Sequence, residues 1–273
     1  MVLAKKVMLL WKRLMDIIDT NYTNFTNMKD IAIFGAGGYG REIACYIRRI
    51  NEVKPTWNLI GYFDDGRPVG EDTQYGKILG GLDALNKWEK PIAVVMAIAT
   101  PKTVRKIVSN IKNDKVEFPN IIDPSVVFLD KDSVKMGKGN VIGANTLIAC
   151  NVIFGDFNLL NCYAQLGHED SIGNYNVVMP NVNISGGVEV GDGNFFGVKS
   201  TILQYQKIGN NTTIGACSVI LKDTEDNSTY YGNPARVISR SEPDGGGKNQ
   251  LRVESLRLRV YLGCALRERR VAA

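Results

Sequence analysis

The sequence predicts an α/β domain followed by an all-β parallel β-helix, and three observations support this prediction. One apolar residue recurs at every sixth position from about Val141 to Thr224, without an insertion. A glycine-rich segment follows a short apolar strand near residue 35, and strands alternate with helical segments up to residue 123. Such alternation is typical of a parallel, doubly wound sheet, whereas a period of six is typical of a coil with three short sides.

The hexad repeat defines the second domain, which we expect over residues 124–238. One anchor per hexad points inward and stacks on its equivalent three hexads later, so that eighteen residues complete a coil. Glycine often follows the anchor, which suits a turn. The anchors are Ile142, Ile148, Phe154, Leu160, Leu166, Ile172, Val178, Ile184, Val190, Phe196, Ile202, Ile208, Ile214 and Ile220. A closing segment is expected at 229–236.

The first domain is expected over residues 28–123 with a Rossmann-like arrangement. Its predicted strands cover 31–34, 59–63, 92–98 and 118–122. Its predicted helices cover 41–50, a segment that opens at 80–85, and 101–111. Parallel strands joined by helices of this length form the doubly wound sheet.

The two ends of the chain account for its net positive charge. Residues 1–27 hold four basic and two acidic side chains, and residues 240–273 hold eight basic and four acidic side chains. The net charge of the whole chain is +5. The body is therefore near neutral, which argues against nucleic acid as a partner. We interpret 1–27 as an extension with an amphipathic helix over 1–20, without expecting membrane contact. Residues 239–273 are expected to be a tail that is disordered or foreign to the natural protein.

The five cysteines are scattered and form no C-x-x-C pair. This distribution favours a reducing compartment, the cytoplasm, and argues against a metal cluster. Cys150 and Cys162 are alternatives as nucleophiles, but small buried cysteines usually fill space.

Residues 35–40 read GAGGYG and match G-x-G-x-x-G between a strand and a helix. Glycines there let the backbone approach a phosphate, and the helix N-terminus favours an anion. Asp64 and Asp65 end the next strand, where a ribose or base contact is expected. Too little chain follows for a nicotinamide half-site, so a mononucleotide or nucleotide sugar is the better ligand. The alternative is that the glycines serve only strand–helix packing.

His168 is the only histidine and lies inside the repeat. Its flanking anchors point inward, which places the imidazole at a corner. A neutral imidazole is the usual base near pH 7, and Glu169 adjoins it. Eighteen residues on lies Gly186, one coil above, where backbone without a side chain could bind a thioester carbonyl. The alternative is a surface histidine at a turn.

The hexads with His168-Glu169 resemble the left-handed β-helix acyltransferases. Together with the glycine-rich domain, Asp64-Asp65, Ala97-Ile98-Ala99, Arg105 and the segment 232–235 (GNPA), residues 29–238 are similar to sugar acetyltransferases of the NeuD and PglD type. The resemblance implies left-handed coils, a homotrimer, acetyl-coenzyme A between adjacent β-helices, and a nucleotide sugar held by the first domain over the same cleft.

The resemblance also implies roles for individual residues. His168 would be the general base, tuned by Glu169, with Asn161 close to that pair. The expected substrate contacts are Gly37, Gly38, Tyr39, Asp64, Asp65 and Ala99. The expected coenzyme A contacts are Val177, Gly186, Val198 and Ala216. Val177 and the segment 99–101 (ATP) depart from the usual pattern of the family, which leaves their contacts open.

The predicted function is cytoplasmic transfer of acetyl from acetyl-coenzyme A to the amine of a nucleotide-linked sugar of the UDP-4-amino-sugar type, in bacterial glycan synthesis. His168 would deprotonate the amine during direct attack, without an acyl-enzyme and without a metal. The alternatives are O-acetylation of sialic acid or another sugar hydroxyl, an NAD-dependent sugar oxidoreductase that uses the glycine-rich loop, and a non-catalytic trimeric scaffold.

Overall fold

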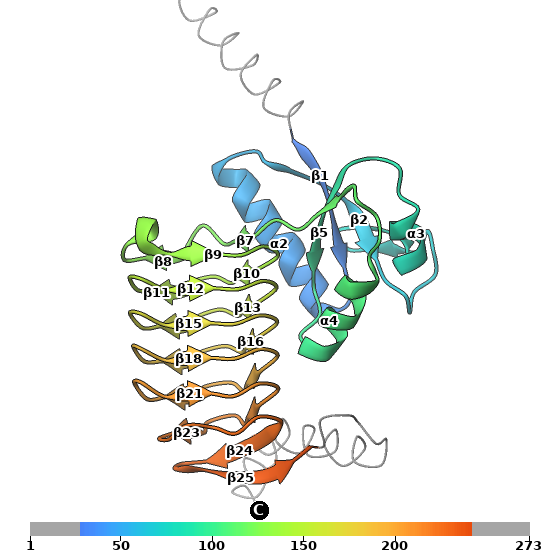
Figure 1. Cartoon of the computed structure of the whole chain (residues 1–273). Helices are drawn as coiled ribbons and strands as arrows, with labels where there is room; N and C mark the ends of the chain where they lie inside the picture. Colours follow the sequence, from blue (N-terminus) through green and yellow to red (C-terminus); the bar gives the residue numbers. More distant parts are fainter. Residues whose placement is uncertain (1–27, 242–273) are drawn as a thin grey trace, which may run out of the picture. The chain divides into compact units, whose positions relative to one another are not determined.

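The protein is described by a computed structural model over residues 28–241. The predictions for residues 1–27 and 242–273 lie outside the described residues. The described residues form two compact units, one of residues 28–94 with Asn113–Glu117, the other of Val95–Lys112 with residues 118–241. The predicted fold class is confirmed: an α/β unit precedes a left-handed parallel β-helix (Figure 1). Residues 95–112 group with the β-helix, a division that the strand–helix pattern did not indicate.

The α/β region is built on a six-stranded sheet in the order β3-β4-β2-β1-β5-β6. β1 (Lys29–Phe34) pairs in parallel with β2 (Trp57–Phe63), and β5 (Ile92–Met96) pairs in parallel with β6 (Val116–Glu117). The helices are α2 (Gly38–Val53), α3 (Leu82–Asn86) and α4 (Pro101–Asn110). β1 and β5 are buried almost throughout, as expected for central parallel strands.

Two details of the predicted α/β elements were wrong. The segment 118–122 is not one strand, because β6 ends at Glu117 and the next strand, β7 (Ile121–Ile122), belongs to the β-helix. The segment before α3 contains an antiparallel hairpin of β3 (Asp72–Thr73) and β4 (Gly76–Gly80). β4 begins at Gly76 and ends at Gly80, both at positive φ. The sequence did not indicate this strand, because glycine at both ends normally signals a turn.

The β-helix has three parallel sheets, one for each side of its coils. The first contains β7, β10 (Val141–Ile142), β13 (Leu159–Leu160), β16 (Val177–Val178), β19 (Phe195–Phe196), β22 (Thr213–Ile214) and the closing strands β24 (Ser228–Gly232) and β25 (Ala235–Arg240). The second contains β8 (Val127–Phe128), β11 (Leu147–Ile148), β14 (Gln165–Leu166), β17 (Asn183–Ile184), β20 (Thr201–Ile202) and β23 (Val219–Ile220). The third contains β9 (Lys135–Met136), β12 (Ile153–Phe154), β15 (Ser171–Ile172), β18 (Glu189–Val190) and β21 (Lys207–Ile208).

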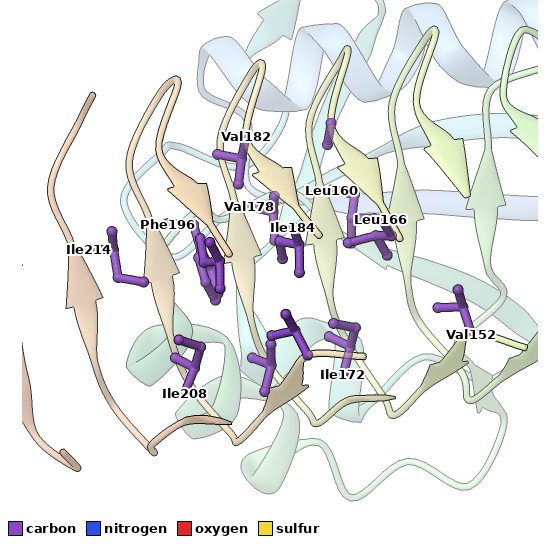
Figure 2. Close-up of a cluster of buried hydrophobic side chains, with 14 of the residues drawn as sticks. Val152, Leu160, Leu166, Ile172, Val178, Val182, Ile184, Phe196, Ile208 and Ile214 are labelled. Atoms are coloured by element: carbon purple, nitrogen blue, oxygen red, sulfur yellow. The ribbon is translucent and has the colours of Figure 1, made fainter. Parts of the chain in front are cut away.

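The predicted eighteen-residue coil is confirmed by the strand pairing, in which Leu160 lies opposite Val178 and Ile184 opposite Ile202. The anchors are buried to 5% exposure or less and fill the interior as one cluster (Figure 2). The first coil is longer, because the 3-10 turn η1 (Lys131–Ser133) interrupts it. Ile142 consequently lies opposite Ile122, twenty residues earlier, which is why the hexad phase is visible only further along the chain.

The turns between sheets share one backbone feature. The third residue of most turns has a positive φ near 57°, as at Asn145, Tyr163 and Glu169. In this left-handed conformation the chain bends by one corner within four residues. After β23, the antiparallel hairpin β24–β25 closes the last coil, as predicted for 229–236.

No helix within residues 28–241 combines the length and the apolar character that a membrane crossing requires.

The stacked core predicts a clear contrast between two isoleucines of the same sheet. Ile208 in β21 is 3% exposed, whereas Ile153 in β12 is 48% exposed. We expect Ile208→Ala to lower the free energy of unfolding by about 2–5 kcal/mol, because a cavity remains in the stack. The matched Ile153→Ala change should cost well under about 1 kcal/mol. Guanidinium unfolding of both variants tests this, and equal losses would contradict the stacking of anchors.

Candidate active site at a corner of the β-helix

His168 lies at the corner between β14 and β15, as the repeat predicted. Its side chain is 55% exposed, and Nδ1 lies 3.5 Å from Glu169 Oε2. Glu169 has a φ of 62°, and this left-handed backbone turns its side chain back beside the imidazole. Glu169 N–H donates to the Cys150 carbonyl, which ties the turn to the coil below. The corner thus presents an imidazole to solvent on a fixed backbone.

Gly186 lies directly against the imidazole, which confirms the geometry predicted from the eighteen-residue spacing. A Cβ at Gly186 would come within 2.6 Å of His168 Nε2. Only glycine therefore leaves the ring in its present place. The N–H of the following residue, Gly187, donates to the His168 carbonyl at 2.8 Å, so the two turns are in contact through backbone as well.

The corners differ in whether side chains occupy the N–H of the second turn residue. Between the third and first sheets these groups are capped: Asp156 N–H donates to Asn174 Oδ1 at 2.8 Å, and Asn174 N–H to Asp192 Oδ1 at 2.7 Å. At the other corners, the N–H groups of Gly186, Val198 and Ala216 make no hydrogen bond to another described residue. Such groups remain available to a ligand.

Tyr205 is a residue of this corner that the sequence reasoning missed. Its N–H donates to the Gly186 carbonyl at 3.1 Å, and its ring covers the position where Gly187 would carry a side chain. The ring is 66% exposed. The available signal was its place eighteen residues after Gly187. Tyr205 fixes the Gly186–Gly187 peptide from the coil above and adds an aromatic surface beside it.

Asp170 ends the His168 turn and was also missed. Its side chain is fully buried, and Oδ1 accepts the Val188 N–H at 2.9 Å. Burial raises the pKa of Asp170 to about 7, although the nearby backbone amides of Val188 and Gly167 oppose this shift. The signal was a carboxylate two places before an anchor, where small, polar or valine residues usually stand.

The other predicted residues of the β-helix lie at different corners. Asn161, Val198 and Ala216 belong to turns between the first and second sheets, and Asn161 Oδ1 accepts the Cys162 N–H. Strand β14 separates Asn161 from His168, so their expected proximity does not arise within one chain. Val177 in β16 is 3% exposed and lines a small cavity with Ile98, Pro101 and Val104. Little of its side chain is therefore accessible to a cofactor.

The glycine-rich loop lies at the carboxyl end of β1, where α2 begins. Gly37 and Gly38 are exposed, and a Cβ on Gly37 would meet no atom within 4 Å. Gly40, in contrast, would clash with the Gly35 carbonyl, so it serves strand–helix packing. The loop thus combines a structural glycine with two open ones at the N-terminus of a sixteen-residue helix. This arrangement suits an anion.

The two aspartates after β2 hold the neighbouring loops. Asp64 Oδ2 accepts the Ala36 N–H at 2.8 Å, and its Oδ1 accepts the Gly66 N–H. Asp65 Oδ1 accepts the Leu82 N–H at 2.7 Å. Arg67, which the sequence reasoning missed, donates to the Ala36 carbonyl and pairs with Glu71. Asp64 therefore shapes the glycine-rich loop directly.

Three further residues complete the placement of the predicted site. Tyr39 lies half-buried in the first turn of α2, and Ala99 lies half-buried two positions before α4. Arg105 of α4 lies 5.0 Å from the Tyr175 ring and 3.6 Å from Asp192, which fastens α4 to the β-helix. Residues 28–241 contain no group of three His, Cys, Asp or Glu side chains that could hold a metal ion.

The fold and the corner define a class of protein, an α/β unit joined to a left-handed β-helix with an exposed histidine. Residues 30–111 match the model of the PglD N-terminal domain family, which confirms the predicted resemblance for this part of the chain. Acyl-(acyl-carrier-protein)–UDP-N-acetylglucosamine O-acyltransferase of Pseudomonas paraeruginosa is 36% identical over 85 residues, 31% of this chain and 33% of the relative. The same enzyme of Pseudomonas entomophila is 33% identical over 111 residues, which are 38% of this chain and 43% of the relative. The chain spans less than half the length of these relatives.

Solved structures resemble the chain over about three quarters of its length. The acetyltransferase domain of PglB from Neisseria gonorrhoeae has a TM-score of 0.70 at 23% identity, over 77% of this chain and 100% of that domain, and it was also solved with acetyl-coenzyme A. WeeI from Acinetobacter baumannii has a TM-score of 0.69 at 26% identity, over 77% of this chain and 100% of WeeI. PerB from Caulobacter crescentus was solved with coenzyme A and GDP-perosamine. It has a TM-score of 0.70 at 24% identity, over 77% of this chain and 97% of PerB.

The close approach at Gly186 generates a test that needs no substrate. Gly186→Ala should displace the imidazole, because Cβ and Nε2 cannot both occupy their places. NMR spectra of the single histidine should show shifted ring resonances. Gly191→Ala introduces a similarly tight Cβ, 2.7 Å from Asn210 Oδ1, at a corner without histidine, and should leave those resonances in place. Unchanged resonances in Gly186→Ala would show that the two turns are further apart.

Proposed function

We propose that this chain transfers the acetyl group of acetyl-coenzyme A to the amine of a nucleotide-linked amino sugar, of the UDP-4-amino-sugar type. The observation that carries the proposal is the corner where the exposed His168 imidazole lies against Gly186, whose N–H makes no hydrogen bond to another described residue. Acyl transfer needs a base for the proton of the attacking group and a donor for the negative oxygen, and here the two lie on adjoining turns. The ligands of the PglB domain and of PerB support this donor and this acceptor class.

In the proposed mechanism the amine nitrogen attacks the thioester carbonyl carbon while His168 takes one of its protons. The N–H of Gly186 donates to the oxygen that becomes negative in the tetrahedral intermediate. The carbon–sulfur bond then breaks, and coenzyme A leaves as the thiol with the proton that His168 returns. Glu169, 3.5 Å from Nδ1, orients the ring. The products are an N-acetylated sugar nucleotide and coenzyme A.

The open N–H groups lie at two different corners, which favours a site shared between chains. Gly186 follows β17, whereas Val198 follows β19 and Ala216 follows β22. A donor that contacts all three, with Asn161 near His168, requires a second copy of the chain. We therefore propose a homotrimer in which the corner of one β-helix faces the other corner of its neighbour, with acetyl-coenzyme A between them. Val177 is left out of this site because it is buried.

The acceptor is assigned to the domain over residues 28–123. Gly37, Gly38 and Tyr39 at the N-terminus of α2 would meet the phosphates of the nucleotide. The outer oxygen of Asp65 is the better candidate for a ribose or base contact, since Asp64 already accepts two backbone hydrogen bonds. Ala99 would line the sugar site.

We propose that the protein works in the cytoplasm, where acetyl-coenzyme A is available. Cys45, Cys150 and Cys217 form no disulfide among the described residues, which agrees with a reducing compartment.

O-acylation is the second candidate, because the curated relatives are O-acyltransferases of UDP-N-acetylglucosamine. A hydroxyl acceptor needs the same base. Release of thiol should be measured with UDP-, dTDP-, GDP- and CMP-sugars, each in amino and hydroxyl form, with acetyl-coenzyme A and acyl-carrier-protein thioesters as donors. Turnover with amino sugars and acetyl-coenzyme A alone supports the proposal. Turnover only with hydroxyl acceptors supports the second candidate.

His168→Asn should lower turnover by about 10²–10⁴-fold, because the proton of the attacking amine is no longer accepted in the transition state. Glu189→Gln is the control, since Glu189 is an exposed residue of the adjoining sheet that pairs with Lys207. Thiol release and thermal unfolding are measured on both. Full turnover in a folded His168→Asn protein would falsify the mechanism.

Gly37→Asp should raise KM for the nucleotide sugar by roughly tenfold, because a carboxylate would face the phosphates. KM for acetyl-coenzyme A should not change. Gly37→Ala is the matched control, since a Cβ there meets open space and carries no charge. If both variants bind the nucleotide sugar like the original chain, the glycine-rich loop is not the phosphate site.

A further inference from the structure

Several polar side chains of the β-helix, each two places before an anchor, form hydrogen bonds to the next coil. Asn140 Oδ1 accepts the Asn158 N–H, eighteen residues on, and Asn140 Nδ2 donates to the Gly155 carbonyl, fifteen residues on. Asn158 repeats both bonds with Asn176 and Gly173. At another corner, the Thr146 hydroxyl donates to the Asn161 carbonyl, again fifteen residues on. At these three places a donor reaches a carbonyl of the next coil, whereas Asn194 Nδ2 and Ser200 Oγ, at the equivalent place in later turns, have no hydrogen-bond partner among the described residues.

Asp170 occupies this place in the His168 turn and makes only half of the pattern. Its Oδ1 accepts the N–H of Val188, eighteen residues on, at 2.9 Å. Its Oδ2 is buried and has no hydrogen-bond partner among the described residues. Fifteen residues on lies the carbonyl of Ser185. A carboxylate oxygen and a carbonyl oxygen repel each other unless a proton lies between them.

We propose that Asp170 is held as a neutral carboxylic acid that donates its proton to the Ser185 carbonyl, and that it thereby positions the Ser185–Gly186 peptide whose N–H faces the reacting carbonyl. This inference rests on the proposed function for the role of that N–H. A hydrogen bond on the carbonyl of a peptide also strengthens the donor at its other end. Asp170 is a positioning residue, since it touches neither substrate nor donor.

The surroundings of Asp170 favour the neutral form. The interior neighbours in its column, Val152 and Val188, are apolar and fully buried. The titratable side chains on the adjoining turns and strands are Cys150, His168, Glu169 and Glu189, of which the last three are exposed. None of them is a cause of the shift, and burial is the largest cause of the raised pKa of about 7.

The pH dependence follows from the direction of this shift. The folded protein keeps the Asp170 proton from about pH 4 to about pH 7, whereas the unfolded chain, with a pKa of 3.8, has released it. Stability from the neutral acid is therefore complete below about pH 4 and is lost as the pH rises to about 7. Asp170→Asn supplies a permanent donor of the same shape. Its melting temperature should exceed that of the original chain by a margin that grows up to about pH 7 and then stays constant.

The experiment compares Asp170→Asn, Asp170→Ala and Asn140→Ala in the full chain. Asn140→Ala removes the same two kinds of hydrogen bond at a corner without histidine. We expect Asp170→Asn to keep kcat within about twofold and Asp170→Ala to lower it by roughly tenfold or more, with little change in KM for acetyl-coenzyme A, because the N–H acts on the transition state. Asn140→Ala should be destabilised with kcat unchanged.

Two outcomes overturn the inference. If the margin between Asp170→Asn and the original chain does not depend on pH, Asp170 is not held neutral. If Asp170→Ala has the kcat of Asn140→Ala, Asp170 does not position the peptide. Failure of the proposed function is recognised separately, because the melting experiment needs no turnover. In that case the ring resonances of His168 replace kcat: they should move in Asp170→Ala and not in Asn140→Ala, and equal spectra reject the inference.

Discussion

The vertical register of the coils is the constraint on which the rest of the structure depends. Each turn and strand of the β-helix donates and accepts hydrogen bonds with the coil above and below, so residues eighteen apart are held in line. His168 meets Gly186 through this register, with the Gly187 N–H bonded to the His168 carbonyl. An insertion between the two turns would shift every later side chain relative to the corner, as a slip does in any sheet. The geometry of the candidate site is therefore a property of the repeat rather than of a local loop.

The same register explains why the corners are not chemically equivalent. Asp156, Asn174 and Asp192 form a ladder in which each side chain caps a backbone N–H of the coil below. That corner is saturated and has little left to offer a ligand. The residues eighteen further on, Gln204, Ala216 and Pro234, do not cap the N–H groups of Gly186, Val198 and Ala216, so these groups remain open. Where the capping side chain is missing, the β-helix leaves N–H groups available to a ligand. Each exposed N–H costs little stability, because water can satisfy it.

The features that could be predicted from the sequence are those that follow from the six-residue period. The hexads predicted the fold, the corner of His168 and the contact with Gly186, because a fixed repeat determines which residues stack. They failed at the first coil, where η1 adds residues, and at Asn161, which belongs to a turn at a different corner from that of His168. Asp170 and Tyr205 were missed because their roles depend on unpaired atoms and ring contacts rather than on spacing. In the α/β unit the glycine loop was found, but the two backbone hydrogen bonds that commit Asp64 left no pattern in the sequence.

The buried acid Asp170 at the end of the His168 turn is energetically costly at a place where an amide can make the same hydrogen bonds. A pKa of about 7 in place of 3.8 penalises the charged form by roughly 4 kcal/mol. Asn140 and Asn158 show that asparagine meets both hydrogen-bond demands of this place without that penalty. The difference is that an acid can release its proton near neutral pH, and doing so would weaken the bond to the Ser185 carbonyl and loosen the turn that carries Gly186. The strength of the proposed oxyanion donor would then vary with pH as Asp170 titrates, and asparagine at 170 would remove that dependence while keeping the geometry.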